Sequence, residues 1–507
     1  MTVAVLLAAC GGGSSPPAQQ PVVTPPVITP PVVTPPVVTP PETIPDDPPP
    51  VRADWLNLLN HCEAPRTGLQ PNGLPYTDVQ GTLQEEQRWL RAFINETYLW
   101  YSEVPTNLHM ADYKTALAYF DVLKTPQITA SGRAKDRFHF TYPTATWDAM
   151  SNNGVELTYG ITWQRNTDAN AKRMWAIALV EPGSPAALAG LRRGDTLLTV
   201  DGVAITDDSV AGTAALNAGL FPVGAGETHK LVVQRAGATL PVSLTSQNLA
   251  MAPVQDVKVI PTASGAVGYM QFYDHNAVSE AALVSAITTF KSAGVQDLVL
   301  DMRYNGGGLL SVAGELAYMI AGPEATSGKS FERLIANDKL NDRTPSRFPT
   351  TAAGLAPALL KKGTVLPYLG LKRVTVLTTP GTCSASESVI NGLRGIDIEV
   401  NLIGGETCGK PYAFVPAPNC GTTYFAIQLQ GVNDKGFGDY ADGFKPTCAA
   451  VDDLAREVGD PSESLLATAL SYRANGVCPV TPLRNRTPSG AMQLVRPQVK
   501  EISILGR

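Results

Sequence analysis

Hydrophobic and polar positions divide the chain into stretches of different periodicity. From Trp89 to Tyr101 apolar residues recur at steps of three and four, which predicts an amphipathic helix, and Thr82 and Glu85 have capping-box spacing at its start. A second helix is expected near Tyr113, because Leu117, Phe120 and Leu123 follow on one side. We therefore expect a helical N-terminal subdomain over residues 51–153.

Beyond Gly154 the pattern changes to short apolar strands separated by turn residues. The predicted strands are VELTYGITW, MWAIALV, DTLLTV, HKLVVQR and LPVSL. This succession predicts a β-rich domain over residues 154–250.

From residue 251 strands alternate with helices. AVGYMQF and VQDLVLD read as buried strands, VSEAALVSAITTFKSAG and LLSVAGELAYMIAG as helices, and KRVTVLTT as a further strand. Alternation of this kind is typical of α/β proteins. We expect an α/β domain over 251–480 and a tail over 481–507, so the whole chain is predicted to be a multidomain α+β protein.

A low-complexity tract with the five-residue period PVVTP precedes the predicted folded region. Proline at this density prevents a packed core and favours extended polyproline II, at about 3.1 Å per residue. We expect residues 10–50 to form a stalk.

The first ten residues are apolar and end at Leu7-Ala8-Ala9-Cys10, which resembles the lipobox of bacterial lipoproteins. The resemblance implies that residues 1–9 are a truncated signal peptide and that lipid is attached to Cys10, which would anchor the protein in the bacterial cell envelope, at the outer membrane, facing the periplasm or the surface. No other apolar run reaches the roughly 18 residues that span a bilayer.

Charge and motif content exclude several functions. The net charge is −6 and no basic block is dense enough to follow a phosphate backbone, which argues against a nucleic-acid partner. The five histidines form neither an H-E-x-x-H pair nor Cys/His zinc spacing, and no nucleotide fingerprint or G-x-S-x-G elbow occurs. We expect no metal and no cofactor.

Six cysteines remain besides Cys10, and an even number in an exported protein suggests disulfides. Six cysteines can form three disulfides in 15 ways. We predict the pairs Cys62–Cys478, Cys420–Cys448 and Cys383–Cys408.

Candidate chemistry centres on LTTPGTCSASESVINGLRG, residues 377–395. Ser384 and Glu387 fit a capping box, so Ser384 could be only a helix cap. The start of a helix is also a place where a developing oxyanion is stabilised. Two further stretches carry complementary features: DMRYNGGG ends a strand in three glycines, and GGETCGKPYAF presents Lys410, which could act as a general base if desolvated.

The stretch EPGSPAALAGLRRGDTLLTVDGVAI, residues 181–205, resembles the PDZ signature. Domains of this kind bind a peptide as an added strand at a sheet edge and hold its carboxylate on backbone N–H groups. By position, the resemblance implies that Tyr159, Gly160 and Ile161 form the carboxylate-binding loop.

Four patterns in order resemble the carboxyl-terminal processing, or tail-specific, serine peptidases: the PDZ signature, DMRYNGGG, SASE and GGETCGK. The resemblance covers about residues 82–410. It implies a catalytic domain of the ClpP and crotonase type, with Ser384 as nucleophile and Lys410 as general base. The oxyanion hole would use the backbone N–H groups of Ala385 and Gly307, with Gly306 as the alternative.

Residues near Ser384 and in the glycine loop are predicted to have structural roles. Ser386 and Ser388 do not match the family's serine, and Cys383 is assigned a structural or disulfide role. Glu387 is expected to cap and orient the helix. Asp301 and Arg303 are expected to brace the glycine loop.

The chain departs from the family pattern after Lys410. Many members place glutamine four residues later, where this chain has Phe414, and Pro411 stands where glycine is common. The third catalytic residue stays open among Glu406, Tyr412 and a residue of YFAIQLQ.

The expected function is therefore that of an exported, lipid-anchored serine endopeptidase. It would capture proteins or peptides with accessible C-termini on its PDZ domain, couple that capture to cleavage, and cut through an acyl-enzyme. Two alternatives remain: a peptide-binding surface lipoprotein that has lost catalysis, and a structural lipoprotein displayed on its stalk. The sequence predicts no oligomeric state.

Overall fold

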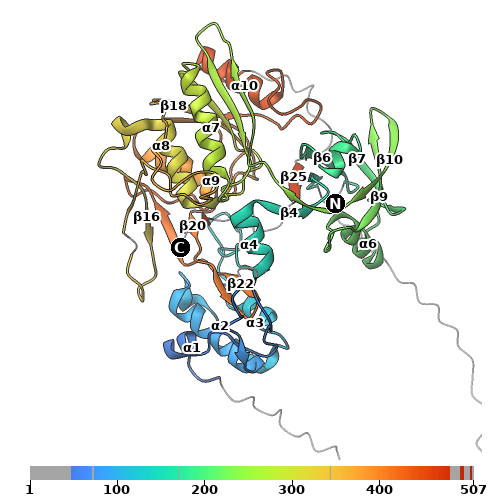
Figure 1. Ribbon diagram of the computed structural model, residues 1–507, viewed down its shortest axis with the longest axis vertical. Helices are drawn as coiled ribbons and strands as arrows, with labels where there is room; N and C mark the ends of the chain where they lie inside the picture. The colour runs from blue at the N-terminus through green and yellow to red at the C-terminus, as the bar shows by residue number, and fades with distance from the viewer. Residues whose placement is uncertain are drawn as a thin grey trace, which may run out of the picture. The chain divides into compact units, whose positions relative to one another are not determined.

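The computed structural model describes residues 47–70, 73–168, 171–342, 344–479, 492–495 and 503–504 (Figure 1). The predicted signal peptide, the lipid site at Cys10 and almost all of the predicted stalk lie outside the described residues. Within the described part of the chain, no helix combines the length and apolar character that crossing a membrane requires.

The predicted β-rich region forms a sheet in the order β10-β9-β7-β6-β5-β25, with β8 beside β7. Its own core contains Trp163, Ile177, Leu197 and Val233, which the alternating pattern places on one face. The elements of this region are β4 (Val155–Thr158), β5 (Ile161–Asn166), β6 (Trp175–Val180), α5 (Pro185–Leu188), β7 (Thr196–Val200), β8 (Val203–Ala204), α6 (Val210–Leu220), β9 (Thr228–Arg235), β10 (Ala238–Thr245), β11 (Gln247–Ala250) and, from the tail, β25 (Met492–Val495).

The predicted α/β region is built on a six-stranded sheet in the order β12-β13-β14-β18-β19-β24. All neighbouring strands from β13 to β24 are parallel, and β12 pairs antiparallel with β13 at one edge. The strands are β12 (Val254–Ile260), β13 (Val267–Phe272), β14 (Asp297–Asp301), β18 (Arg373–Thr378), β19 (Glu399–Gly404) and β24 (Cys448–Ala449).

Helices cover both faces of this sheet (Figure 1). Leu298 and Leu300 of β14 pack on the side of α7 (Ser279–Ser292), α8 (Leu310–Thr326) and α9 (Ala385–Gly395). Val299 points to the other side, where α10 (Ser464–Asn475) packs. Because both faces are buried, the strands read as continuous apolar runs, as the sequence indicated.

The N-terminal region contains the two predicted helices, α2 (Leu83–Thr97) and α3 (Ala116–Val122), together with α1 (Arg52–Asn57), β3 (Phe140–Pro143) and α4 (Thr144–Asn153). The Thr82 hydroxyl accepts the Glu85 N–H, which confirms the predicted start of α2. Strand β3 pairs with β22 (Thr422–Phe425), and the rings of Trp89 and Phe120 contact Tyr424. This region and the α/β region therefore share one hydrophobic core.

The disulfides correct two of the three predicted pairings. Cys383 is joined to Cys408 as predicted, but the other bonds are Cys62 to Cys420 and Cys448 to Cys478. The prediction failed because β1 (His61–Cys62) lies beside the turn at residue 420, where the Asn60 N–H donates to Asn419 Oδ1 at 2.7 Å. Such long-range neighbours have no signature in cysteine spacing.

Two buried glutamates hold the loop that covers α7 and α8. Glu280 accepts the N–H groups of Gly354 and Leu355, each at 2.9 Å, and Glu315 accepts that of Ala353 at 2.9 Å. Burial, reinforced by the neighbouring Glu280 carboxylate, raises the pKa of Glu315 to about 8. Glu315 therefore keeps its proton at neutral pH.

Alkaline pH is expected to destabilise the fold through Glu315. Its pKa is higher in the folded than in the unfolded state, so its stabilisation is complete below about pH 4.5 and disappears as the pH rises through about 8. Urea unfolding from pH 5 to 9 should show a loss of a few kcal/mol, at about 1.4 kcal/mol per pKa unit. Glu315→Gln should flatten this dependence, whereas Glu324→Gln, on the exposed face of α8, should leave it unchanged. An unaltered slope in Glu315→Gln would refute the assignment.

Candidate active site

Ser384 lies at the N-cap of α9, in a backbone conformation that side chains rarely adopt, with φ 60° and ψ −115°. Such strain costs about 1–3 kcal/mol and persists only where the surroundings fix it. Here the Cys383 N–H donates to Asn305 O at 3.0 Å, and the Ser388 N–H donates to Ser384 O at 2.9 Å. The turn is thus held between the glycine loop and its own helix, and Ser384 is fully buried.

The Glu387 carboxylate joins the turn of Ser384 to that of Lys410. Its Oε2 accepts the Ser384 N–H at 2.9 Å and the Lys410 N–H at 2.8 Å. Its Oε1 accepts from Thr407 Oγ1 at 2.6 Å and from the Gly409 N–H at 2.9 Å. Because one oxygen binds both, the backbone nitrogens of Ser384 and Lys410 lie close together. The predicted capping role of Glu387 is confirmed, and the residue also orients the second turn.

Burial and hydrogen bonding act in opposite directions on this carboxylate. Burial raises the pKa of Glu387, and the bonds from Thr407, Lys410, Ser384 and Gly409 oppose that rise. The Cys383–Cys408 disulfide links the same two turns, with Cα atoms 5.1 Å apart. The relative position of the turns is therefore fixed by a covalent bond and a shared carboxylate.

The Lys410 side chain is buried between aromatic rings, with 1% of its surface exposed. Its Nζ lies 4.1 Å from the ring centroid of Phe414 and 4.7 Å from that of Phe138. Contact with rings stabilises a charged amine by about 2 kcal/mol, while the loss of its water costs several. A lysine amine can accept a proton only in its neutral form.

Phe414 stands where the family pattern has glutamine, and the structure places it directly against the amine. Of the alternatives for a third catalytic residue, Tyr412 packs its ring on Trp100 with the centroids 5.0 Å apart. Phe138, which lies next to β3, was not indicated by any sequence signal, because it is separated from Lys410 by most of the chain.

The glycine loop is organised by Asn305 and His275, both fully or almost fully buried. Asn305 Nδ2 donates to Phe272 O at 3.0 Å, so its Oδ1 is the acceptor for the Gly307 N–H at 2.9 Å and for His275 Nδ1 at 3.0 Å. Burial lowers the pKa of His275 to about 3, so the ring stays neutral. The N–H of Gly307 is thus already bonded within the loop.

The neighbouring serines and cysteine have structural partners. Ser386 Oγ donates to Asn305 O at 3.0 Å, Ser388 Oγ donates to Glu332 Oε1 at 3.1 Å, and Cys383 is in its disulfide. The disulfide confirms the structural role predicted for Cys383.

Three parts of the chain are similar to known protein families. Residues 266–436 match Peptidase family S41, residues 85–142 match the Peptidase S41 N-terminal domain, and residues 177–219 match a PDZ domain. Residues 266–436 are therefore similar to an S41 peptidase domain, and this region is called the S41 domain below. The S41 match includes the glycine loop, Ser384 and Lys410.

Relatives and solved structures agree with this assignment. The chain is 28% identical over 278 residues to the chloroplastic C-terminal processing peptidase of Tetradesmus obliquus, covering 52% of each chain. It is 28% identical over 253 residues to the carboxyl-terminal-processing protease of Synechocystis, covering 50% of this chain and 52% of the relative. The chain thus spans about half the length of these curated relatives. A Bacteroides fragilis protein designated an S41 protease is 25% identical, with a TM-score of 0.58, covering 79% of this chain and 98% of that chain.

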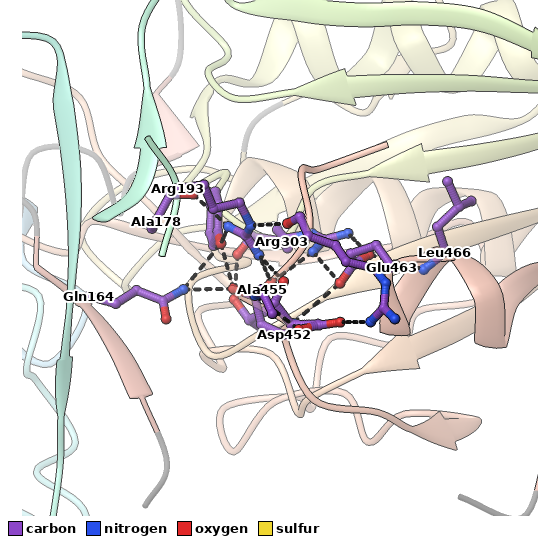
Figure 2. A network of polar contacts seen from close by, with 12 residues as sticks. Gln164, Ala178, Arg193, Arg303, Asp452, Ala455, Glu463 and Leu466 are labelled. Carbon is purple, nitrogen blue, oxygen red and sulfur yellow. Dashed lines mark hydrogen bonds and ion pairs between the residues drawn. The ribbon is translucent and has the colours of Figure 1, made fainter. Parts of the chain in front are cut away.

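Arg303 connects the S41 domain to the PDZ domain through a buried polar network (Figure 2). Its guanidinium bonds to Asp301 at 3.0 Å, Asp452 at 2.8 Å and Glu463 at 2.9 Å. Asp301 and Arg303 thus bond to one another at the end of β14, just before the glycine loop that they were predicted to brace.

The PDZ domain contributes Arg193 and Gln164 to the same carboxylate. Arg193 Nη2 and Gln164 Nε2 both donate to Asp452, the latter at 2.7 Å, as Figure 2 shows. Although burial alone would raise it, Arg193 and Arg303 hold the pKa of Asp452 well below its usual range. Asp452 and Glu463 follow Arg303 by 149 and 160 residues, so no sequence pattern paired them.

The predicted carboxylate loop of the PDZ domain is tightly packed. Gly160 has φ +82°, and a Cβ there would lie 2.2 Å from Ser184 Cβ, so only glycine fits. Tyr159 O accepts the Ala186 N–H at 3.0 Å, which binds the loop to α5, and Ile161 begins β5. The predicted loop therefore leads directly into β5.

Two groups of potential metal ligands occur in the described part of the chain, Cys62 with Glu86 and Cys420, and Cys383 with Glu387 and Cys408. In each group the cysteines are joined to one another as a disulfide, so they offer no thiolate.

Proposed function

We propose that the protein is an exported serine endopeptidase of the C-terminal processing type. The observation that carries this proposal is the shared carboxylate: Glu387 holds Ser384 and Lys410 together at a buried site inside the S41 domain. A lipid on Cys10 would anchor the enzyme at the cell envelope.

The proposed reaction proceeds through an acyl-enzyme. Ser384 Oγ attacks the scissile carbonyl carbon while its proton passes to the neutral Nζ of Lys410. The oxyanion is stabilised by the N–H groups of Ala385 and of the glycine loop. Lys410 then returns the proton to the leaving amine, and water, activated by the same amine, hydrolyses the ester.

Use of Gly307 as an oxyanion donor requires a local change, because its N–H bonds to Asn305 Oδ1 in this structure. Release of that bond would provide the donor, and Gly306 is the alternative. We therefore propose Gly307 as an oxyanion donor only after its N–H has been released from Asn305.

Substrates are proposed to be proteins or peptides with accessible C-termini. The PDZ domain supplies a strand edge for them. Near the glycine loop, a cavity of about 610 Å³ is lined in part by Leu309, Tyr76 and Trp147, and it has room for substrate side chains.

Capture and cleavage are proposed to be coupled through the Asp452 network. A shift of the PDZ domain would move Arg193 and so disturb Arg303, whose backbone adjoins the glycine loop. The PDZ turn at Gly194 also contacts the segment that follows Asp452, since a Cβ on Gly194 would lie 2.4 Å from Leu454 O.

The proposed function is tested by sequencing the peptides released from a denatured protein mixture. Wild type should release peptides that are absent from Ser384→Ala and from a no-enzyme control. Equal release by Ser384→Ala would overturn the peptidase assignment. Binding of C-terminal peptides without any release would favour the alternative of a peptide-binding protein, to which Phe414 in place of glutamine points.

Loss of the Cys383–Cys408 disulfide is expected to lower kcat about 100-fold, because displacement of catalytic groups by about 1 Å has effects of this size. KM should change little, since the PDZ edge is not touched. The double variant Cys383→Ser/Cys408→Ser is compared with Cys448→Ser/Cys478→Ser, which removes a disulfide in the same domain. Equal kcat values for the two double variants would show that the disulfide does not position the site.

A further inference from the structure

The edge of the PDZ sheet that a peptide would use is occupied by the chain itself. Strand β5 has β6 on one side and β25 on the other, and β25 is the segment Met492–Val495 of the tail. Pairing to an open sheet edge is the interaction by which PDZ domains bind peptides. The tail therefore takes the place of a peptide ligand.

Strand β25 runs along β5 in the same direction as a C-terminal peptide bound to a PDZ domain. The pairing is antiparallel, with Met492 opposite Asn166 and Val495 opposite Trp163. Residue numbers in the tail thus rise toward the predicted carboxylate loop that precedes β5. A bound C-terminal peptide would run the same way.

Side chains of β25 contact both the PDZ core and the turn before Ser384. Val495 packs against the PDZ core. Leu494 Cδ1 lies 2.6 Å from the position that a Cβ on Gly381 would take, and Gly381 is three residues before Ser384. The segment therefore lies between the peptide-binding edge and the nucleophile turn.

A second piece of the tail pairs with the glycine loop. Strand β26 (Ser503–Ile504) pairs in parallel with β15 (Gly308–Leu309), which directly follows Gly307. Strand β26 also contacts β20 (Tyr412–Ala413), which lies just after Lys410 in the sequence. One tail thus meets the PDZ edge and both loops of the proposed catalytic site.

We propose that the segments 492–495 and 503–504 are an internal pseudosubstrate, which must leave β5 and β15 before a substrate peptide binds. The catalytic part of this inference rests on the proposed function, whereas the occupation of the PDZ edge does not. A tethered segment competes at an effective concentration of the order of millimolar. If the tail binds the edge with a Kd of the order of micromolar, it should therefore weaken the binding of a free peptide at least tenfold.

The experiment compares full-length variants. Leu494→Asp/Val495→Asp places charges on the two packed positions of β25, and Gln493→Asp, at an exposed position of the same strand, is the matched control. The probe is an N-terminally labelled hexapeptide, GAMQLV, which copies residues 490–495 and ends in a free carboxylate. Binding is measured by fluorescence anisotropy, a readout that needs no catalysis.

The double variant is expected to bind the probe at least tenfold more tightly than wild type and Gln493→Asp. Hydrogen exchange should show faster exchange in β5 and unchanged exchange in α7, which establishes that the variant is folded. If the proposed function also holds, KM for a longer peptide falls while kcat stays the same. Equal probe affinity in all three proteins, or no binding to the folded double variant, would overturn the inference. Absence of hydrolysis with the expected binding difference would instead refute only the peptidase function.

Discussion

Lys410→Arg is expected to abolish peptide hydrolysis at every pH, with a loss of at least about 10³-fold in kcat/KM. The arginine side chain remains charged throughout the accessible pH range and cannot take the proton of Ser384. In wild type, kcat/KM should rise with pH as the buried amine loses its proton. Rates are measured with a quenched fluorescent peptide from pH 6 to 10.

The control for this prediction is Lys410→Met, which keeps an unbranched chain between Phe138 and Phe414 but has no amine. It should fold and be as inactive as the arginine variant. Lys339→Met removes a different lysine that contacts a ring, that of Tyr101, and should retain activity. Turnover by Lys410→Arg within tenfold of wild type would exclude Lys410 as the base.

Arg303→Met is expected to reduce the free energy of unfolding by about 3–5 kcal/mol. The change leaves Asp301 and Glu463 buried without their cation, whereas Asp452 keeps Arg193. Breaking a buried ion pair by removing one partner costs this much. The measurement is urea unfolding at pH 7. At pH values where the carboxylates become protonated the difference from wild type should shrink.

Arg373→Met is the matched control, since Arg373 also pairs with a buried carboxylate, that of Asp297. Asp297 keeps a second partner, Arg473, and Arg373 itself is 45% exposed, so a loss of about 1 kcal/mol or less is expected. Comparable losses in the two variants would show that the Arg303 network contributes no more than a surface pair.

Local sequence patterns predicted the elements that carry the site. The apolar run before Asp301 and the capping spacing of Ser384 and Glu387 both correspond to observed elements, because they depend on neighbours within a few residues. The Cys383–Cys408 bond also agrees with the predicted pairing; Cys383 directly precedes SASE, and Cys408 lies within GGETCGK.

Contacts between segments that are distant in the sequence could not be predicted from local sequence patterns. Glu463 meets Arg303, Phe138 meets Lys410, and Cys420 meets Cys62 only because the fold brings separate segments together. The same holds for β25: its four residues show no pattern that distinguishes a loose tail from a strand added to β5. Long-range pairing is set by which sheet edge stays open, and that is a property of the assembled sheet.

The proposed mechanism requires Ser384 to be a nucleophile that Lys410 activates at a closed site. The most direct test is treatment of the native protein with a fluorophosphonate probe, followed by peptide mapping of the adduct. We expect a single adduct on Ser384, formed faster at alkaline pH in wild type and at least 100-fold more slowly in Lys410→Met. An adduct on another residue, or equal labelling of Ser384→Ala and wild type, would contradict it.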